Sequence, residues 1–169
     1  MELDRLNWDT SNIENACDAI LEVLEFNGFD DATENYETYF SKRFNELLAS
    51  NGITKGEFGY KGNKDKIDSI HKEANIYACK RAIEDCCETP EEFSRMASSW
   101  MGSRWAEDNP ECIESLIYLL KPLDDKIKDE KDRAAKEELM SRGATDMYDF
   151  GKWTENTEIF EHILRECGK

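Results

Sequence analysis

Apolar positions recur every three or four residues along most of the chain, which is the period of an amphipathic α-helix. Ser11 and Glu14 have the spacing of a capping box, and Asn27-Gly28 has the composition of a left-handed helix stop. Between these two signals, one face of the expected helix carries Ile13, Cys17, Ile20 and Leu24. The pattern predicts a first helix over residues 13–26.

Six further helices are predicted in the same way, over residues 32–50, 67–87, 90–108, 110–121, 124–142 and 159–164. Asp31 and Glu34 are expected to cap the second helix, and Asn51-Gly52 is expected to end it. Thr89-Pro90 marks the start of the fourth, because proline is favoured in the first turn of a helix. Pro122 is expected to end the fifth helix, because an interior proline removes a backbone hydrogen bond.

No segment alternates like a strand, apart from a short piece within residues 53–61. The sequence therefore predicts an all-α fold, with about seven helices in a single compact domain over residues 1–169. Two segments are expected to be irregular. Residues 53–66 are rich in glycine and lysine and predict a mobile basic loop, while residues 143–153 form an aromatic segment. The loop lacks the lysine-hydroxyl ending of a phosphate-binding P-loop.

Composition adds a strong negative charge to this picture. The 169 residues include 38 Asp and Glu against 22 Lys and Arg, for a formal net charge of -16. This charge argues against direct binding of nucleic acid or of an anionic membrane. No apolar run reaches the ~20 residues of a membrane span, and six cysteines without a secretion signal are interpreted as reduced thiols. We expect a cytoplasmic protein in a reducing environment.

The negative charge is concentrated near the start of the chain. Residues 1–41 contain one base, Arg5, and eleven acids. Four of the acids recur at helical spacing along the first helix: Glu14, Asp18, Glu22 and Glu25. Their carboxylates would stand about 4.5 to 6 Å apart along the axis, close to the phosphate spacing of a nucleic-acid strand. Like charges at this spacing cost about 0.2–0.5 kcal/mol per pair, so helix stability alone does not favour them.

The last predicted long helix shows the opposite arrangement. Its acids precede bases in the favourable i,i+4 order, in the pairs Asp124 with Lys128, Asp129 with Arg133 and Asp132 with Lys136. This pattern is typical of a solvated face. The contrast suggests that the acids of the first helix have a different role.

A concentrated anionic surface attracts a basic one and can occupy a groove meant for nucleic acid. The leading hypothesis is an acidic protein-binding inhibitor that mimics a polyanion. Its partner would be a basic protein, such as a nucleic-acid-processing defence enzyme or a nuclease, as for anti-CRISPR, antirestriction or immunity proteins encoded by phages or plasmids. Met101 and Trp105 supply a candidate hydrophobic contact, because Met and Trp are enriched at interface cores.

Two other functions stay open from the sequence. The acids of the first helix could pair with the lysines of residues 53–66, within one chain or across a homodimer, as in a homo-oligomeric structural or adaptor protein. An enzyme is the second alternative. Glu34-x-x-Glu37 and Asp65-x-x-Asp68 resemble the ExxE...ExxD arrangement of all-α nucleoside triphosphate pyrophosphatases, and the resemblance implies that these four acids hold Mg²⁺.

Other catalytic and metal sites are not indicated. The two histidines, His71 and His162, have no neighbouring nucleophile in a recognisable arrangement. His71, Cys79 and Cys86 would spread over more than ~20 Å of one helix, which is too far for a single zinc ion. Apart from the magnesium alternative, we therefore expect no cofactor.

Overall fold

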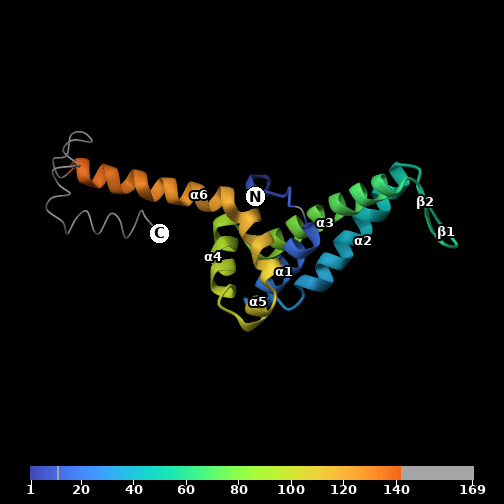
Figure 1. Cartoon of the computed structure of the whole chain (residues 1–169), viewed down its shortest axis with the longest axis horizontal. Helices are drawn as coiled ribbons and strands as arrows, with labels where there is room; N and C mark the ends of the chain where they lie inside the picture. The colour runs from blue at the N-terminus through green and yellow to red at the C-terminus, as the bar shows by residue number, and fades with distance from the viewer. Residues whose placement is uncertain (11, 142–169) are drawn as a thin grey trace. The chain divides into compact units, whose positions relative to one another are not determined.

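The computed structural model describes residues 1–10 and 12–141 of the chain (Figure 1). This part is mostly helical, which confirms the all-α prediction. The chain divides into two compact units, Met1–Leu123 and Asp124–Lys169. The elements are η1 (Leu3–Arg5), α1 (Ile13–Phe26), α2 (Ala32–Ser50), β1 (Thr54–Gly56), β2 (Gly59–Lys61), α3 (Lys64–Cys86), α4 (Pro90–Trp100), α5 (Arg104–Asp108) and α6 (Pro110–Ser141).

Four sequence predictions involve residues outside the described part of the chain. These are the helix at 159–164, the aromatic segment at 143–153, His162, and the capping role of Ser11. Within the described residues, no helix is long and apolar enough to cross a membrane.

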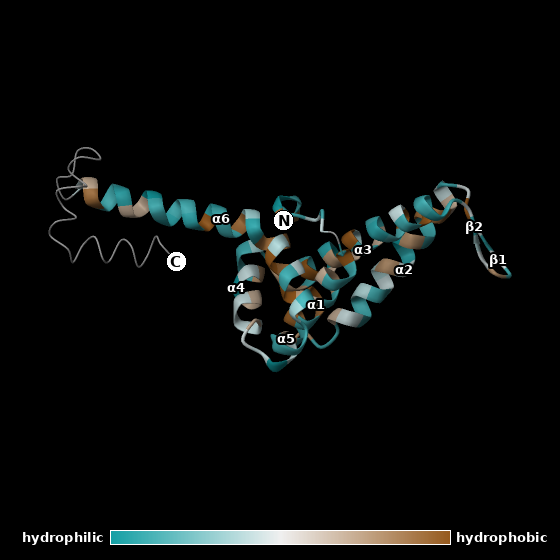
Figure 2. Ribbon diagram, viewed as in Figure 1, coloured by the Kyte–Doolittle hydropathy of each residue, from teal (hydrophilic) through white to brown (hydrophobic). Residues whose placement is uncertain are grey.

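Helix α1 is the central helix of the first unit and packs against α2, α3 and α4. Eight of its 14 residues are buried: Ile13, Ala16, Cys17, Ala19, Ile20, Leu21, Val23 and Leu24. Figure 2 shows hydrophobic residues gathered where α1 meets its neighbours. The apolar face is thus wider than the four positions found from the sequence, because small alanines let neighbouring helices approach closely from several sides.

The predicted stops of α1 and α2 are confirmed, and the predicted caps are found only in part. Gly28 and Gly52 follow the two helices with φ of 94° and 66°, in the left-handed region that glycine favours. At the start of α1, it is the Asn12 side chain that accepts hydrogen bonds from the first-turn N–H groups. Asp31 lies at the N-cap of α2 but makes no capping hydrogen bond with its side chain.

Helices α2 and α3 pack along each other and carry a second hydrophobic cluster, formed by Phe44, Leu48, Ile53, Ile70 and Ala74. The connection between them contains a β-hairpin, which lies within the short strand-like piece noted at residues 53–61, and α3 begins at Lys64, inside the predicted loop. Ile53 is buried in the cluster, and the ring of Tyr60 packs edge-on against Phe44 with centroids 5.6 Å apart. These contacts hold strands of only three residues, which are too short to show a clear alternation.

The helix boundaries after Thr89 differ from the predictions at two places. Thr89 caps α4 as predicted, but the chain then breaks, and Ser103 caps a separate short helix, α5. Helix α6 continues through Pro122 as one element. An interior proline costs about 3 kcal/mol, and the fully buried leucines on either side of it, Leu120 and Leu123, supply packing that offsets this cost.

The first eight residues contribute to the core although no periodicity indicated it. Leu3, Leu6 and Trp8 are buried. The indole N–H of Trp8 donates a hydrogen bond to the carbonyl oxygen of Leu3 at 2.8 Å. The backbone N–H of Asn7 donates a hydrogen bond to the carbonyl oxygen of Leu119 in α6 at 2.9 Å. The segment before α1 is therefore attached to the body of the first unit.

Candidate functional site: an acidic strip on helix α1

Glu14, Asp18, Glu22 and Glu25 lie on the narrow face of α1 that its neighbours leave uncovered, and we call them the acidic strip. Glu14 and Asp18 are exposed, while Glu22 and Glu25 are half-buried. Because eight other residues of α1 are buried, most of the solvent-facing surface of this helix is carboxylate. Placement on a solvent-facing strip agrees with the prediction made from their spacing.

No carboxylate of the acidic strip forms an ion pair with a lysine or arginine of the described residues. The Thr33 hydroxyl of α2 donates a hydrogen bond to Glu25. The lysines of the hairpin region, which the sequence left open as partners, form no ion pair with the strip within this part of the chain. The other three carboxylates of the strip, those of Glu14, Asp18 and Glu22, have no side-chain hydrogen bond or ion pair within the described residues.

Other acids near the start of the chain are neutralised, and the count made from the sequence overstated the excess there. Lys80 of α3 pairs with Asp4 at 2.5 Å, and Lys72 of α3 pairs with Asp9 at 3.3 Å. The Asp4 pKa is lowered by its hydrogen bond and attraction to Lys80. These ion pairs join residues more than 60 positions apart, so local sequence could not reveal them. Among the described acids near the start of the chain, those of the strip remain without an ion pair, as do Asp30, Asp31, Glu34 and Glu37 around the start of α2.

The carboxylates of the strip repel one another. Burial raises the pKa of Asp18, and the charge of Glu14 raises it further. Burial also raises the pKa of Glu22, with added contributions from Glu25 and Asp18. Both shifts mean that the fold holds these groups where their ionised form is disfavoured, so a positive partner would be attracted to them.

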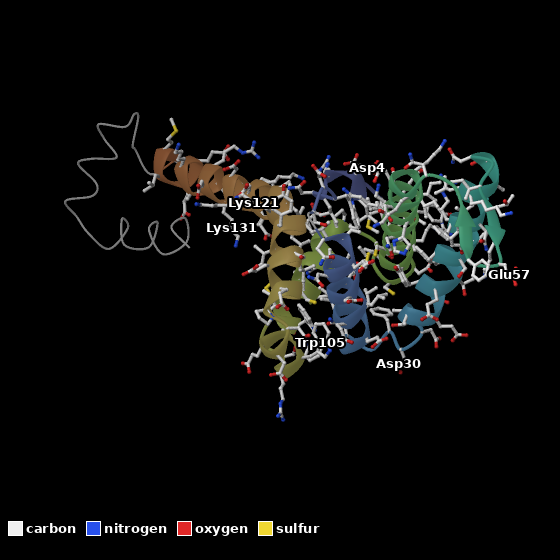
Figure 3. All side chains as sticks on the ribbon, turned by 45° about the vertical axis from the view of Figure 1, so that its right-hand side comes forward. Asp4, Asp30, Glu57, Trp105, Lys121 and Lys131 are labelled. Carbon is white, nitrogen blue, oxygen red and sulfur yellow. The ribbon has the colours of Figure 1, made fainter. Side chains whose placement is uncertain are left out.

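The first turn of α6 lies beside the strip. Burial raises the pKa of the Cys112 thiol, and Asp18, Glu111 and Glu22 raise it further, which places the first turn of α6 beside the strip. Glu111 is exposed. Figure 3 shows α1 with α6 on one side and α2 on the other. Sequence reasoning missed this proximity, because Cys112 lies 90 or more positions from Asp18 and Glu22 and only the tertiary fold brings them together.

Comparison with protein-family models, curated proteins and solved structures finds no match. The function must therefore be argued from the residues themselves.

Trp105 and Met101, the candidate hydrophobic contact, are each half-buried. The ring of Trp105 leans on the fully buried Trp100, with centroids 5.7 Å apart and planes inclined by 42°. Trp105 belongs to α5, and Met101 is the C-cap of α4. Trp105 is labelled in Figure 3. Part of each side chain is used for packing, and only the remaining surface is open to a partner.

The four acids of the magnesium alternative do not converge. Glu34 and Glu37 lie at the start of α2, which contacts the second half of α3 through the hydrogen bonds of Tyr36 to Asn75 and of Tyr39 to Asp85. Asp65 and Asp68 lie at the other end of α3, at least about 10 Å further along its axis.

Starts of consecutive antiparallel helices lie at opposite ends of the pair, so the expected arrangement was wrong. Among the described residues, no group of three or more His, Cys, Asp or Glu side chains has the arrangement of a metal site.

The buried polar groups of the first unit form a structural network. The Tyr36 hydroxyl donates to the side-chain oxygen of Asn75, and the amide nitrogen of Asn75 lies 3.1 Å from Nδ1 of His71. Burial raises the pKa of Tyr36 and of the Cys79 thiol. A raised thiol pKa means a protonated, unreactive cysteine. The arrangement supports the interpretation of these residues as core rather than catalytic groups.

Replacing Asp18 with Asn is expected to stabilise the fold at pH 7 by about 0.2–0.5 kcal/mol, because the change removes like-charge repulsion with Glu14 and Glu22. The pKa of Asp18 is raised above its ordinary value of 3.8 in the folded state. Its destabilising effect is therefore absent below that value and develops as the pH rises through the raised folded pKa. Thermal unfolding at a series of pH values checks both points.

The advantage of the Asn variant should shrink as the pH is lowered from neutrality toward 3.8. Asp129→Asn on the exposed surface of α6 is the control, and it should change stability less. An Asp18→Asn protein that is less stable than the wild type at pH 7 would show that this carboxylate stabilises the fold.

Proposed function

We propose that this protein is an inhibitor that binds a basic protein surface through the acidic strip and thereby imitates a polyanion. The observation that carries the proposal is the row of exposed or half-buried carboxylates on a mostly buried helix, Glu14, Asp18, Glu22 and Glu25, none of which forms an ion pair within the described residues. The partner class that fits is a nucleic-acid-processing enzyme, such as a restriction, CRISPR or toxin nuclease, whose binding groove is lined with lysine and arginine.

The energetics support a binding role over a purely structural one. The strip costs stability through partial burial of its carboxylates and through repulsion between them, and both effects raise the pKa of Asp18 and of Glu22, with burial the larger. A basic groove would replace this repulsion with attraction and would speed encounter over distances of about 10 Å at physiological salt. The position of the strip on a central, well-packed helix holds the charges in a fixed geometry before binding. Pre-organisation of this kind reduces the entropy lost on association.

Partner capture tests the proposal. The full chain is immobilised and exposed to a lysate of its source cells, and bound proteins are eluted with a salt gradient and identified by mass spectrometry. We expect a basic nucleic-acid-binding protein whose retention falls as salt rises. Short duplex DNA or RNA added to the column should release the same protein, because the nucleic acid competes for the same groove.

A neutral polymer of similar length is the matched control and should release nothing. Retention of only acidic or neutral proteins would contradict the proposal, and so would a basic partner that nucleic acid fails to displace.

A further inference from the structure

The tip of the β-hairpin presents an aromatic side chain to solvent. The side chain is that of Phe58, which is 98% exposed, more than any other large hydrophobic residue in the described part of the chain. Glu57 and Phe58 form a two-residue turn between strands in register from Thr54 opposite Lys61 to Gly56 opposite Gly59. Gly59 has a φ of 118°, a conformation that other residues rarely adopt, so the turn is specified by the sequence. An isolated, fully exposed Phe on such a turn is suited to insertion into a partner.

Four exposed lysines lie on the hairpin strands and in the first turn of α3 that follows them: Lys55, Lys61, Lys64 and Lys66. None of them forms an ion pair within the described residues. Residues 42–73 contain seven Lys and Arg against five Asp and Glu, whereas the whole chain has 22 against 38. The hairpin is therefore a basic region of an otherwise acidic protein, and its partner should combine an apolar surface with negative charge.

A hollow that combines apolar side chains with negative charge lies at the turn between α1 and α2. It has a volume of about 370 Å³. Half-buried or buried apolar side chains, Phe29, Ala32 and Cys86, contribute to its lining. Its exposed residues include three aspartates, Asp30, Asp31 and Asp85. The hollow thus pairs an apolar lining with a carboxylate rim, which complements the aromatic tip and lysines of the hairpin.

The hairpin cannot reach the hollow of its own chain. The hollow adjoins the first residue of α2, and the hairpin follows the last turn of the same helix. The 19 residues of α2 separate them by about 28 Å. Figure 1 shows β1 and β2 at the opposite end of the α2–α3 pair from the α1–α2 connection, and Figure 3 labels Glu57 of the hairpin and Asp30 of the hollow. Any contact between the two must be made with another molecule.

We propose that a second copy of this chain is that molecule, with Phe58 of each copy seated in the α1–α2 hollow of the other. Lys55 and Lys61 would lie against Asp30 and Asp31 at the rim. Because the same helix separates hairpin from hollow in both copies, two α2–α3 pairs laid antiparallel about a two-fold axis satisfy both junctions at once. The acidic strip takes no part, so self-association is independent of the proposed inhibitory function.

Analytical ultracentrifugation of the full chain over a range of concentrations tests the proposal, and we expect a salt-sensitive dimer. Phe58→Ser combined with Lys61→Glu disables the hairpin, and Asp30→Lys combined with Asp31→Asn disables the hollow. Asn is chosen at position 31 because it is a favourable N-cap residue. Each variant alone should dimerise at least about tenfold more weakly than the wild type, from the lost apolar burial.

Mixing the two variants gives the decisive result. The hairpin-disabled copy keeps an intact hollow and the hollow-disabled copy keeps an intact hairpin, so a 1:1 mixture should form a heterodimer through one junction. An affinity tag on one variant and fluorescence on the other detect it. Circular dichroism confirms that both variants are folded.

Ile117→Ser on α6 removes another exposed apolar side chain and should leave the dimer unchanged. Asp18→Lys with Glu22→Lys should also leave it unchanged. A monomeric wild type at millimolar concentration would overturn the proposal, as would hairpin-disabled protein that dimerises normally or a mixture that yields no heterodimer.

Discussion

Replacing Asp18 and Glu22 together with lysine is expected to lower the affinity for the captured basic partner at least about a hundredfold, which is about 2.7 kcal/mol. The two positions are the centre of the acidic strip, and reversal changes each from attraction to repulsion against a basic groove. The fold should tolerate the change, because both side chains reach solvent and neither makes an ion pair in the described residues. Calorimetric titration at two salt concentrations measures the loss.

The matched control is Asp129→Lys with Glu137→Lys on exposed positions of α6, which changes the net charge by the same amount. If net charge alone governs binding, both double variants lose affinity equally, and the acidic strip has no special role. If the strip is the contact surface, only its own variant loses the hundredfold. Higher salt should narrow the difference between strip variant and wild type, because screening weakens attraction and repulsion alike.

The helix pattern was largely readable from the sequence because amphipathic periodicity and glycine stops are local. Helices α1 and α2 end where Gly28 and Gly52 were expected to end them. The prediction at Pro122 failed because proline propensity is a local cost, whereas the burial of Leu120 and Leu123 is a tertiary gain that no local pattern contains. The β-hairpin was indicated only as a short strand-like piece within residues 53–61, because strands of three residues show little alternation and the packing of Tyr60 against Phe44 is a tertiary contact.

The acidic strip was predictable, and its surroundings were not. Spacing alone placed Glu14, Asp18, Glu22 and Glu25 on one face, because a helix has a fixed period. Charge pairing needs three-dimensional proximity, so the sequence could not show that Lys80 neutralises Asp4. The α6 pairing predicted for Asp129 with Arg133 is not formed in the described residues, where Lys126 pairs with Glu130 at 3.8 Å instead. Sequence therefore located the unpaired charges better than the paired ones.

The magnesium alternative failed through topology. The spacing within each acidic pair was read correctly, but the starts of two consecutive antiparallel helices lie at opposite ends of the pair. Contacts of Tyr36 with Asn75 fix this register. An error of this kind comes from helix direction and not from any single residue.

Replacing Trp100 with Ala is expected to destabilise the protein by about 3–5 kcal/mol, a large fraction of the 5–15 kcal/mol typical of a folded domain. Trp100 is 1% exposed and lies on the buried face of α4 with Phe93 and Ala97. Removing the indole leaves a cavity and also takes away the surface on which Trp105 rests. The thermal midpoint should fall by about 6 to 20 °C, as measured by circular dichroism.

Trp105→Ala separates packing from binding at the same place. Because Trp105 is half-buried, its loss should cost at most about 2 kcal/mol, and the chain should stay folded. If Trp105 contacts the basic partner, Trp105→Ala loses affinity at a temperature where the protein is fully folded. Trp100→Phe is the control and should keep both the fold and the affinity. The contrary result is that Trp100→Ala and Trp105→Ala lose the same stability and Trp105→Ala keeps its affinity for the partner. Both rings would then belong to the core, and the acidic strip would be the sole contact surface in the proposal.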